Sequence, residues 1–184
     1  KLAAIPTTAG SGAEVTINGV IYIDGIKYSL ENELLMPDNF FLVPDFLISA
    51  PKKIKASAGF DTIAQSLESI ISKKSTEESI INASKSLRIS LNSYISFLNN
   101  PNLKNATEMS IASNLSGKAI SISKTTAPHA VSYAFTSLFN ISHGYAVGLF
   151  FENFFKFNYD NLDNTTVSFD LRKRFNLIFN LFDV

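Results

Sequence analysis

Hydrophobic and polar positions divide the chain into two zones with different periods. In the first zone, apolar residues alternate loosely with polar ones over residues 16–23 and again over 26–30. The pair 24–25 between them, Asp-Gly, is a strong hairpin signal. Residues 40–43 form a short apolar run closed by a proline, which predicts one further strand. The first zone is therefore expected to be a small β segment.

From Pro51 onward, the apolar positions follow the 3.6-residue period of amphipathic helices. The third of these helices should stop before Pro128, and a polar segment at 159–166 should separate the last two. The expected helical segments are 63–71, 80–98, 109–122, 143–157 and 168–182. The pattern alone thus predicts a short β segment followed by a helical domain.

The composition narrows the classes of protein. Of the 184 residues, 46% are hydrophobic and 17% charged, which is enough for a core and excludes global disorder. Sixteen basic residues balance 16 acidic ones, so the chain as a whole lacks a basic surface for nucleic acid. No apolar run approaches the length of a membrane span.

The absence of cysteine excludes disulfides and cysteine nucleophiles and fits a reducing compartment, so we expect a cytoplasmic protein. Because the sequence begins at Lys1 and not at Met, we interpret it as a piece of a longer protein.

Two segments place polar groups where they could bind a ligand. Over residues 5–16 an apolar strand runs into hydroxyls and two glycines, a turn whose N–H groups and oxygens suit a phosphate or a ribose. An ordinary turn at the end of a strand explains the same pattern.

Asp61 and Gln65 lie four residues apart on one face of a predicted helix, within reach of a single ligand. Asp61 also fits as an acidic residue that stabilises a helix N-terminus.

The two histidines of the chain, His129 and His143, form the third candidate. Fourteen residues of unbroken helix would hold them roughly 21 Å apart, too far to share one ion. They can meet only if the chain reverses between them, and residues 139–142 are a suitable corner, after which each histidine would start a helix. Neutral imidazole is the form that binds metal. The alternative is two unrelated, partly buried histidines.

The order of these segments resembles that of the iron-containing (group III) alcohol dehydrogenase family. Residues 6–16, Pro-Thr-Thr-Ala-Gly-Ser-Gly-Ala-Glu-Val-Thr, match a family motif nearly throughout, and residues 44–61 match the approach to its metal-binding helix. The two histidines match in order and spacing. The resemblance covers essentially the whole chain. It implies a mainly α fold, with 1–43 as the C-terminal part of an α/β nucleotide-binding domain and 44–184 as a helical metal and substrate domain that is incomplete at its C-terminus.

The resemblance also implies an activity and a metal. It implies hydride transfer between NAD or NADP and a small alcohol or aldehyde, with a divalent metal, iron or zinc, polarising the substrate oxygen. The implied metal ligands are Asp61, Gln65, His129 and His143. Gln65 departs from the family pattern, which has a histidine there, and a neutral amide is a weaker ligand than imidazole for iron or zinc.

Further residues acquire implied roles from the same resemblance. Tyr133 occupies a place where many members have another histidine near the substrate, and its phenol can hydrogen-bond an alcohol or pass a proton. Tyr133 and His129 are therefore the expected catalytic groups. The expected cofactor contacts are Thr7, Thr8 and Ser11.

The substrate and the partners follow less directly. Residues 61–69, 75–79 and 128–133 are similar to a branch associated with phosphonoacetaldehyde reduction, and Lys124 is the nearest cation in sequence for a phosphonate. Lys124 fits equally well as a solvated lysine at a helix end. We expect a small-molecule substrate, no nucleic acid or membrane partner, and a homodimer. A dehydroquinate-synthase-like enzyme of the same fold and a catalytically inactive helical module are the alternatives.

Overall fold

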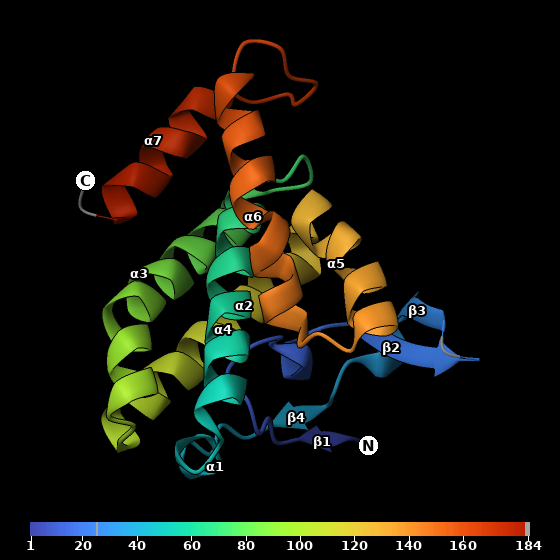
Figure 1. The fold of residues 1–184 in the computed structure, drawn as a ribbon, viewed down its shortest axis with the longest axis vertical. Helices are drawn as coiled ribbons and strands as arrows, with labels where there is room; N and C mark the ends of the chain where they lie inside the picture. The colour runs from blue at the N-terminus through green and yellow to red at the C-terminus, as the bar shows by residue number, and fades with distance from the viewer. Residues whose placement is uncertain (25, 183–184) are drawn as a thin grey trace.

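The computed structural model describes residues 1–24 and 26–182. They form a short β segment followed by a mainly helical part, as predicted (Figure 1). The elements in chain order are β1 (Ala3–Ala4), the 3-10 turn η1 (Ala13–Val15), β2 (Asn18–Ile23), β3 (Ile26–Glu31), η2 (Glu33–Leu35), β4 (Asn39–Phe40), α1 (Asp45–Ile48), α2 (Lys52–Ile71), α3 (Glu77–Asn99), α4 (Leu103–Ser123), α5 (Ala127–Phe139), α6 (His143–Asp160) and α7 (Leu171–Leu181).

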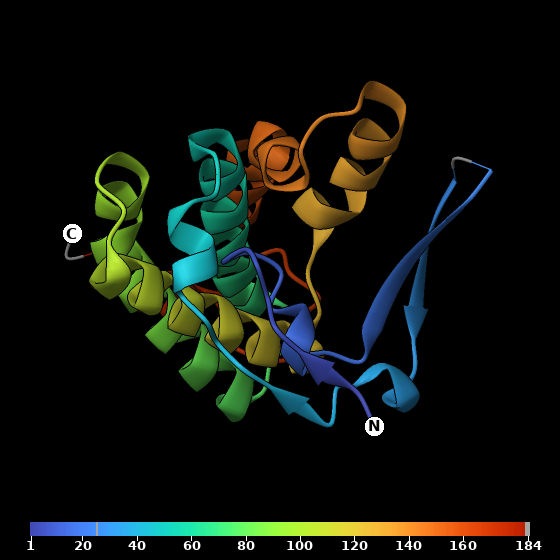
Figure 2. The same cartoon turned by 90° about the horizontal axis from the view of Figure 1, so that it is seen from below.

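The β segment contains two separate pairs of strands. Strands β2 and β3 form the predicted antiparallel hairpin, with Asn18 opposite Glu31 at its open end. Gly25, part of the predicted turn, lies outside the described residues. Figure 2 shows this hairpin projecting away from the helices. The strand predicted at 40–43 is wrong beyond its first residue, because β4 pairs in parallel with β1, which offers a partner only two residues long.

Helix α2 is the central element of the helical part. Figure 1 shows it in the middle, with α3 to one side and α6 to the other. Residues 61–71 are buried on every side because α3, α4, α6 and α7 all contact this helix. A helix buried all round is normally apolar. This one carries Asp61, Gln65 and Glu68, so their polar groups need partners inside the molecule.

Serine side chains form much of the contact between α2, α3 and α4. Ser66 donates to Ser86 at 2.9 Å, and Ser86 donates in turn to the carbonyl of Ala112 at 2.7 Å. The predicted apolar stripe of α4 is partly wrong for this reason, since Leu115 and Ile122 are only half-buried. Serine side chains are small, so hydrogen-bonded serines let helix backbones approach closely. The buried faces of these helices therefore need not show a hydrophobic pattern in the sequence.

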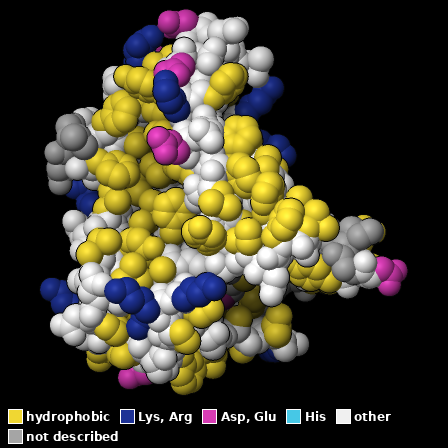
Figure 3. Space-filling model, in the orientation of Figure 1, with side chains coloured by type: hydrophobic (Ala, Val, Ile, Leu, Met, Phe, Trp, Pro, Cys, Tyr) yellow, Lys and Arg dark blue, Asp and Glu magenta, His cyan; other side chains and the backbone are white. Residues whose placement is uncertain are grey.

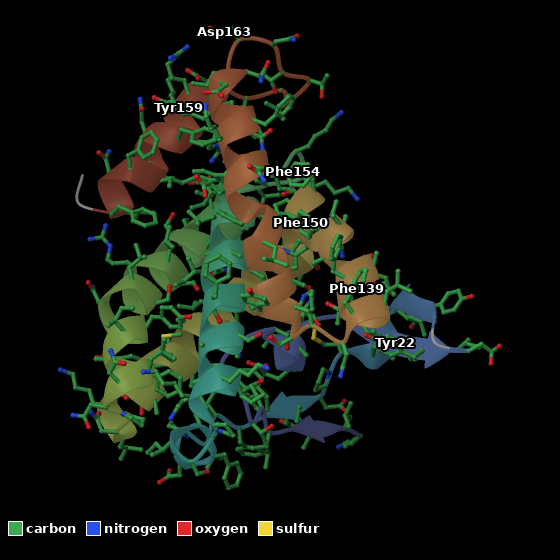
Figure 4. The ribbon with its side chains drawn as sticks, in the orientation of Figure 1. Tyr22, Phe139, Phe150, Phe154, Tyr159 and Asp163 are labelled. Carbon is green, nitrogen blue, oxygen red and sulfur yellow. The ribbon has the colours of Figure 1, made fainter. Side chains whose placement is uncertain are left out.

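The reversal predicted at 139–142 joins α5 to α6. Helix α5 ends at Phe139, Asn140 adopts the left-handed conformation with φ 52° and ψ 37°, and His143 is the first residue of α6. Aromatic rings hold the two helices together, with Phe135 4.6 Å from Phe150 between ring centroids; Phe139 and Phe150 are labelled in Figure 4. Hydrophobic side chains also gather on the outer surface over α5 and α6 (Figure 3). Within the described residues, none of the helices is both long and apolar enough to cross a membrane.

Candidate metal centre

Three side chains from three helices converge on one point. Asp61 comes from the middle of α2, His129 from the first turn of α5, and His143 from the start of α6. One potential ligand atom from each lies within 4.8 Å of the other two. His129 Nε2 is 3.0 Å and His143 Nε2 is 3.7 Å from the same oxygen, Asp61 Oδ1. The chain reversal after Phe139 is what brings the two histidines together, and their ring centroids are 5.3 Å apart.

The chemistry of this donor set fits a divalent cation. A carboxylate and two imidazoles are ligands that iron and zinc both accept. Burial alone would lower the pKa of His129, but hydrogen bonds and charges from Asp61 and Glu68 outweigh it and raise the pKa to about 10. Two buried carboxylates facing one imidazole therefore create a strong demand for positive charge, which a proton or a metal ion at Nε2 can meet.

Gln65 lies beside this group but presents its amide nitrogen to it. Its Nε2 donates to Asp61 Oδ2 at 3.1 Å, and its Oε1 accepts from the Ser116 hydroxyl at 3.1 Å. In this arrangement Gln65 orients the carboxylate of Asp61. Its role as a ligand stays a prediction, because the amide would have to turn to offer its oxygen.

Glu68, to which the sequence pattern assigned no role, completes the buried group of polar side chains. It lies on α2 seven residues after Asp61, two helical turns further along the same face. Its Oε1 is 2.5 Å from His129 Nδ1, the ring nitrogen on the other side from Asp61. The seven-residue spacing from Asp61 could have identified Glu68 as part of the site. An acidic residue on the same face of a buried helix as a metal ligand needs a partner there.

Tyr133 lies one turn after His129 on α5, next to the three converging side chains. Its ring stacks on that of His143, with centroids 6.0 Å apart. Burial, followed by the charges of Asp61 and Glu68, raises the pKa of the phenol. The phenol therefore keeps its proton at neutral pH and can donate it in a hydrogen bond.

The segment 6–16 docks on the helices through one set of residues and exposes another. Thr62, the neighbour of Asp61, donates to the carbonyls of Ala9 and Gly10, both at 3.2 Å. Gly12, with φ +59°, fits against Gly117 of α4 so closely that a Cβ on either would overlap the other's backbone. The residues predicted to contact the cofactor, which are all exposed, are Thr7, Thr8 and Ser11. The docking places these hydroxyls on a turn fixed beside Asp61, and their contact with a cofactor stays a prediction.

Lys124 has a partner within the chain. Its ammonium is 2.6 Å from Glu31 Oε1 at the end of the hairpin, an ion pair open to solvent. Its backbone, with φ 59° and ψ 170°, lies in a region that residues with side chains rarely adopt. A phosphonate would have to compete with Glu31 for this lysine.

A large pocket among the described residues is a separate feature. It has a volume of about 770 Å³ and lies between α2, α3 and the start of α6, with Phe60, Tyr94 and Gly144 among its lining residues. Asp61, His129 and His143 do not line it. The chemistry of this molecule is therefore better located by the convergence of ligand atoms than by the size of a pocket.

Known proteins are similar to this chain in both sequence and fold. The chain is 34% identical over 158 residues to 1-propanol dehydrogenase PduQ of Citrobacter freundii, a match that covers 84% of the chain and 43% of that protein. It is 27% identical to the phosphonoacetaldehyde reductase of Streptomyces viridochromogenes, over 86% of the chain and 41% of the relative. The chain thus spans less than half the length of these curated relatives.

Solved structures agree with the sequence comparison. The sulfoacetaldehyde reductase of Bifidobacterium kashiwanohense, solved in complex with NAD+, is 28% identical and superposes with a TM-score of 0.81, over 97% of this chain and 50% of that one. Residues 55–180 match the family model of the Fe-containing alcohol dehydrogenase family, C-terminal. The chain therefore belongs to the Fe-containing alcohol dehydrogenase family, and residues 55–180 correspond to the C-terminal part of that family's fold.

Proposed function

We propose that this chain is the metal-holding part of an oxidoreductase that transfers a hydride between NAD or NADP and a small alcohol or aldehyde. The observation that carries the proposal is the convergence of Asp61, His129 and His143 from three different helices. Membership of the Fe-containing alcohol dehydrogenase family supports it. In this proposal 44–184 are the metal and substrate domain, and 1–43 are the end of a nucleotide-binding domain.

The three converging side chains would hold one divalent ion, iron or zinc, with Gln65 as a fourth ligand if its amide turns. Such an ion, when bound, acts as a Lewis acid on the oxygen of the substrate. Asp61 supplies negative charge to the site, and Gln65 holds that carboxylate through its N–H. The α5–α6 corner fixes the two imidazoles, so little reorganisation is needed when a cation enters.

Tyr133 is the proposed proton donor, with His129 beside it in the catalytic group. The raised pKa of the phenol keeps it protonated while a carbonyl oxygen gains negative charge during reduction. Its stacking on His143 places the ring next to the proposed metal ligands. In the reverse direction the phenolate that remains after this donation would take the proton back from the alcohol.

The exposed hydroxyls of Thr7, Thr8 and Ser11 are the proposed contacts to the cofactor. Thr62, the residue next to Asp61, ties their turn to α2, so a nicotinamide held there would lie near the substrate oxygen. Hydride chemistry belongs to the cofactor, and the protein orients it. A homodimer is the proposed assembly, and the cytoplasm the proposed compartment.

The names of the relatives point to short substrates. One relative is a 1-propanol dehydrogenase and another a phosphonoacetaldehyde reductase. We propose a short aldehyde and its alcohol as the substrate pair, with phosphonoacetaldehyde as one specific candidate. Lys124 would bind the phosphonate only if it releases Glu31.

The test uses the full-length protein, the wild type beside His143→Ala. Metal content is measured by elemental analysis, and the oxidation of NADH and of NADPH is followed with propanal and with phosphonoacetaldehyde. We expect one divalent ion per site and aldehyde-dependent oxidation in the wild type, and loss of both in the variant. Lys118→Ala, an exposed change on α4, serves as the control.

Two results would contradict the proposal. A wild type that holds no metal and turns over no aldehyde would indicate an inactive helical module. Turnover of a bulky dehydroquinate-synthase-type substrate in place of short aldehydes would assign a different reaction to the same fold.

A further inference from the structure

The carboxylate of Glu68 lies on the far side of the His129 ring from the proposed metal position. Glu68 is 1% exposed, so its charge is removed from water. Its Oε1 is 2.5 Å from His129 Nδ1. Its Oε2 accepts from both the backbone N–H of Thr126, at 2.5 Å, and the hydroxyl of Thr126, at 2.7 Å. One carboxylate therefore contacts both the residue that precedes α5 and the histidine in the first turn of that helix.

We infer that Glu68 is a positioning residue that fixes the ring of His129, so that Nε2 points at Asp61 and His143 and is the nitrogen offered to a metal. The inference rests on the proposed function, because it assigns Glu68 to the same metal site. A neutral imidazole that donates from Nδ1 to a carboxylate keeps its lone pair on Nε2. Histidines that ligate metals commonly donate their other N–H in this way, which fixes the tautomer and raises ligand basicity.

The hydroxyl of Thr126 supports an active use of Glu68. A threonine that precedes a helix commonly accepts a hydrogen bond from an N–H of the first turn, a cap that contributes about 1 kcal/mol. Thr126 makes no such side-chain cap, and its hydroxyl donates to Glu68 instead. The local capping bond is thus replaced by one that holds the carboxylate against His129.

The division of the two carboxylate oxygens separates two effects of Glu68. Oε2 and the two donors of Thr126 attach α5 to α2, where a negative charge also suits the positive end of the helix dipole. Oε1 contacts the imidazole. Loss of the first contact should affect stability, whereas loss of the second should affect the ligand geometry, and the two can be measured apart.

The experiment measures Zn²⁺ and Fe²⁺ affinity of the full-length protein by competition with a chelator. The test variant is Glu68→Gln, which keeps the shape but is neutral and brings an NH₂ group against either the donors of Thr126 or the Nδ1–H. We expect metal affinity to fall by about 10- to 100-fold. Glu78→Gln, an exposed change on α3, is the matched control and should leave the affinity unchanged.

Thr126 provides a second pair of variants in case Glu68→Gln does not fold. Thr126→Val removes the hydroxyl that holds Oε2, whereas Thr126→Ser keeps it. Weaker metal binding in Thr126→Val, with wild-type affinity in Thr126→Ser, is the expected result. Nitrogen-15 NMR of the histidines gives a readout independent of activity, since the wild type with zinc should show His129 protonated at Nδ1 and coordinated through Nε2.

The outcomes separate the inference from the proposed function. Zinc binding by the wild type with equal affinity in Glu68→Gln, or coordination through Nδ1, would overturn the role of Glu68 and leave the metal site in place. Failure of the wild type to bind either metal would overturn the proposed site, and with it this role of Glu68.

Discussion

Gly144 lies directly against the backbone of Ser57, so that a Cβ at position 144 would overlap the carbonyl oxygen of Ser57. This close approach joins the first turn of α6 to α2 one residue after His143. Because Asp61 is one turn along α2 from Ser57, the missing side chain at Gly144 is what allows His143 to reach Asp61.

We expect Gly144→Ala to push the start of α6 away from α2. Overpacking of this kind lowers the free energy of unfolding by about 1–3 kcal/mol. Metal affinity should fall by about tenfold or more, the scale seen when the alignment of a ligand is lost. Gly148→Ala on the same helix is the control, because its Cβ would meet only the ring of Phe60, at 3.3 Å. Equal zinc affinity in both variants would show that the contact with Ser57 does not position His143.

Gln65→His should introduce an imidazole where the chain has an amide. The residue is buried beside Asp61, one helical turn away, so the new side chain would face the same point. Zinc and iron affinity should rise by at least about tenfold, equivalent to about 1.4 kcal/mol, and magnesium affinity should not. Gln65→Leu is the control, which fills the space without a donor atom. Titration of the full-length proteins with each metal measures the difference, and a zinc affinity no higher than that of the wild type would contradict it.

Gly117→Ala should disturb the docking of the 6–16 segment. A Cβ on Gly117 would overlap the backbone of Gly12, which cannot yield as a side chain does. We expect the free energy of unfolding to fall by about 1–3 kcal/mol and the KM for the nicotinamide cofactor to rise. Lys104→Ala, an exposed change near the start of the same helix, should change neither. An unchanged KM in a destabilised Gly117→Ala protein would show that this turn does not contribute to cofactor binding.

Lys124→Gly should stabilise the protein although it removes an ion pair. The backbone of Lys124 has a positive φ that costs a residue with a side chain about 1–3 kcal/mol. Its pair with Glu31 is exposed, and such pairs contribute about 0.2–1 kcal/mol. We expect the midpoint of urea unfolding to rise in Lys124→Gly and to fall slightly in Lys124→Ala, which loses the pair but keeps the strain. A lower midpoint in the glycine variant would show that the ion pair is the larger effect.

The order of strands and helices was predictable from the sequence because it depends on the spacing of apolar residues within each segment. The change from alternating to 3.6-residue spacing near Pro51 gave the order of the strands and helices, and the Asp-Gly pair gave the hairpin. Element ends and buried faces were less predictable. The strand at 40–43 fails because its partner β1 is short, and Leu115 is half-buried because the neighbouring serines of α4 make the contacts.

Sequence pattern and family resemblance indicated four residues that could bind a metal: Asp61 and Gln65 on one face of a predicted helix, and the two histidines on either side of a corner. Whether they meet depends on the fold, because their separation is set by the turn at Asn140 and by the close contact of Gly144 with Ser57. The fold also directs the amide oxygen of Gln65 towards Ser116 and places Glu68 against His129. The last two of these contacts join residues 51 and 61 positions apart, and a local pattern holds no information on which distant polar groups a buried helix will face.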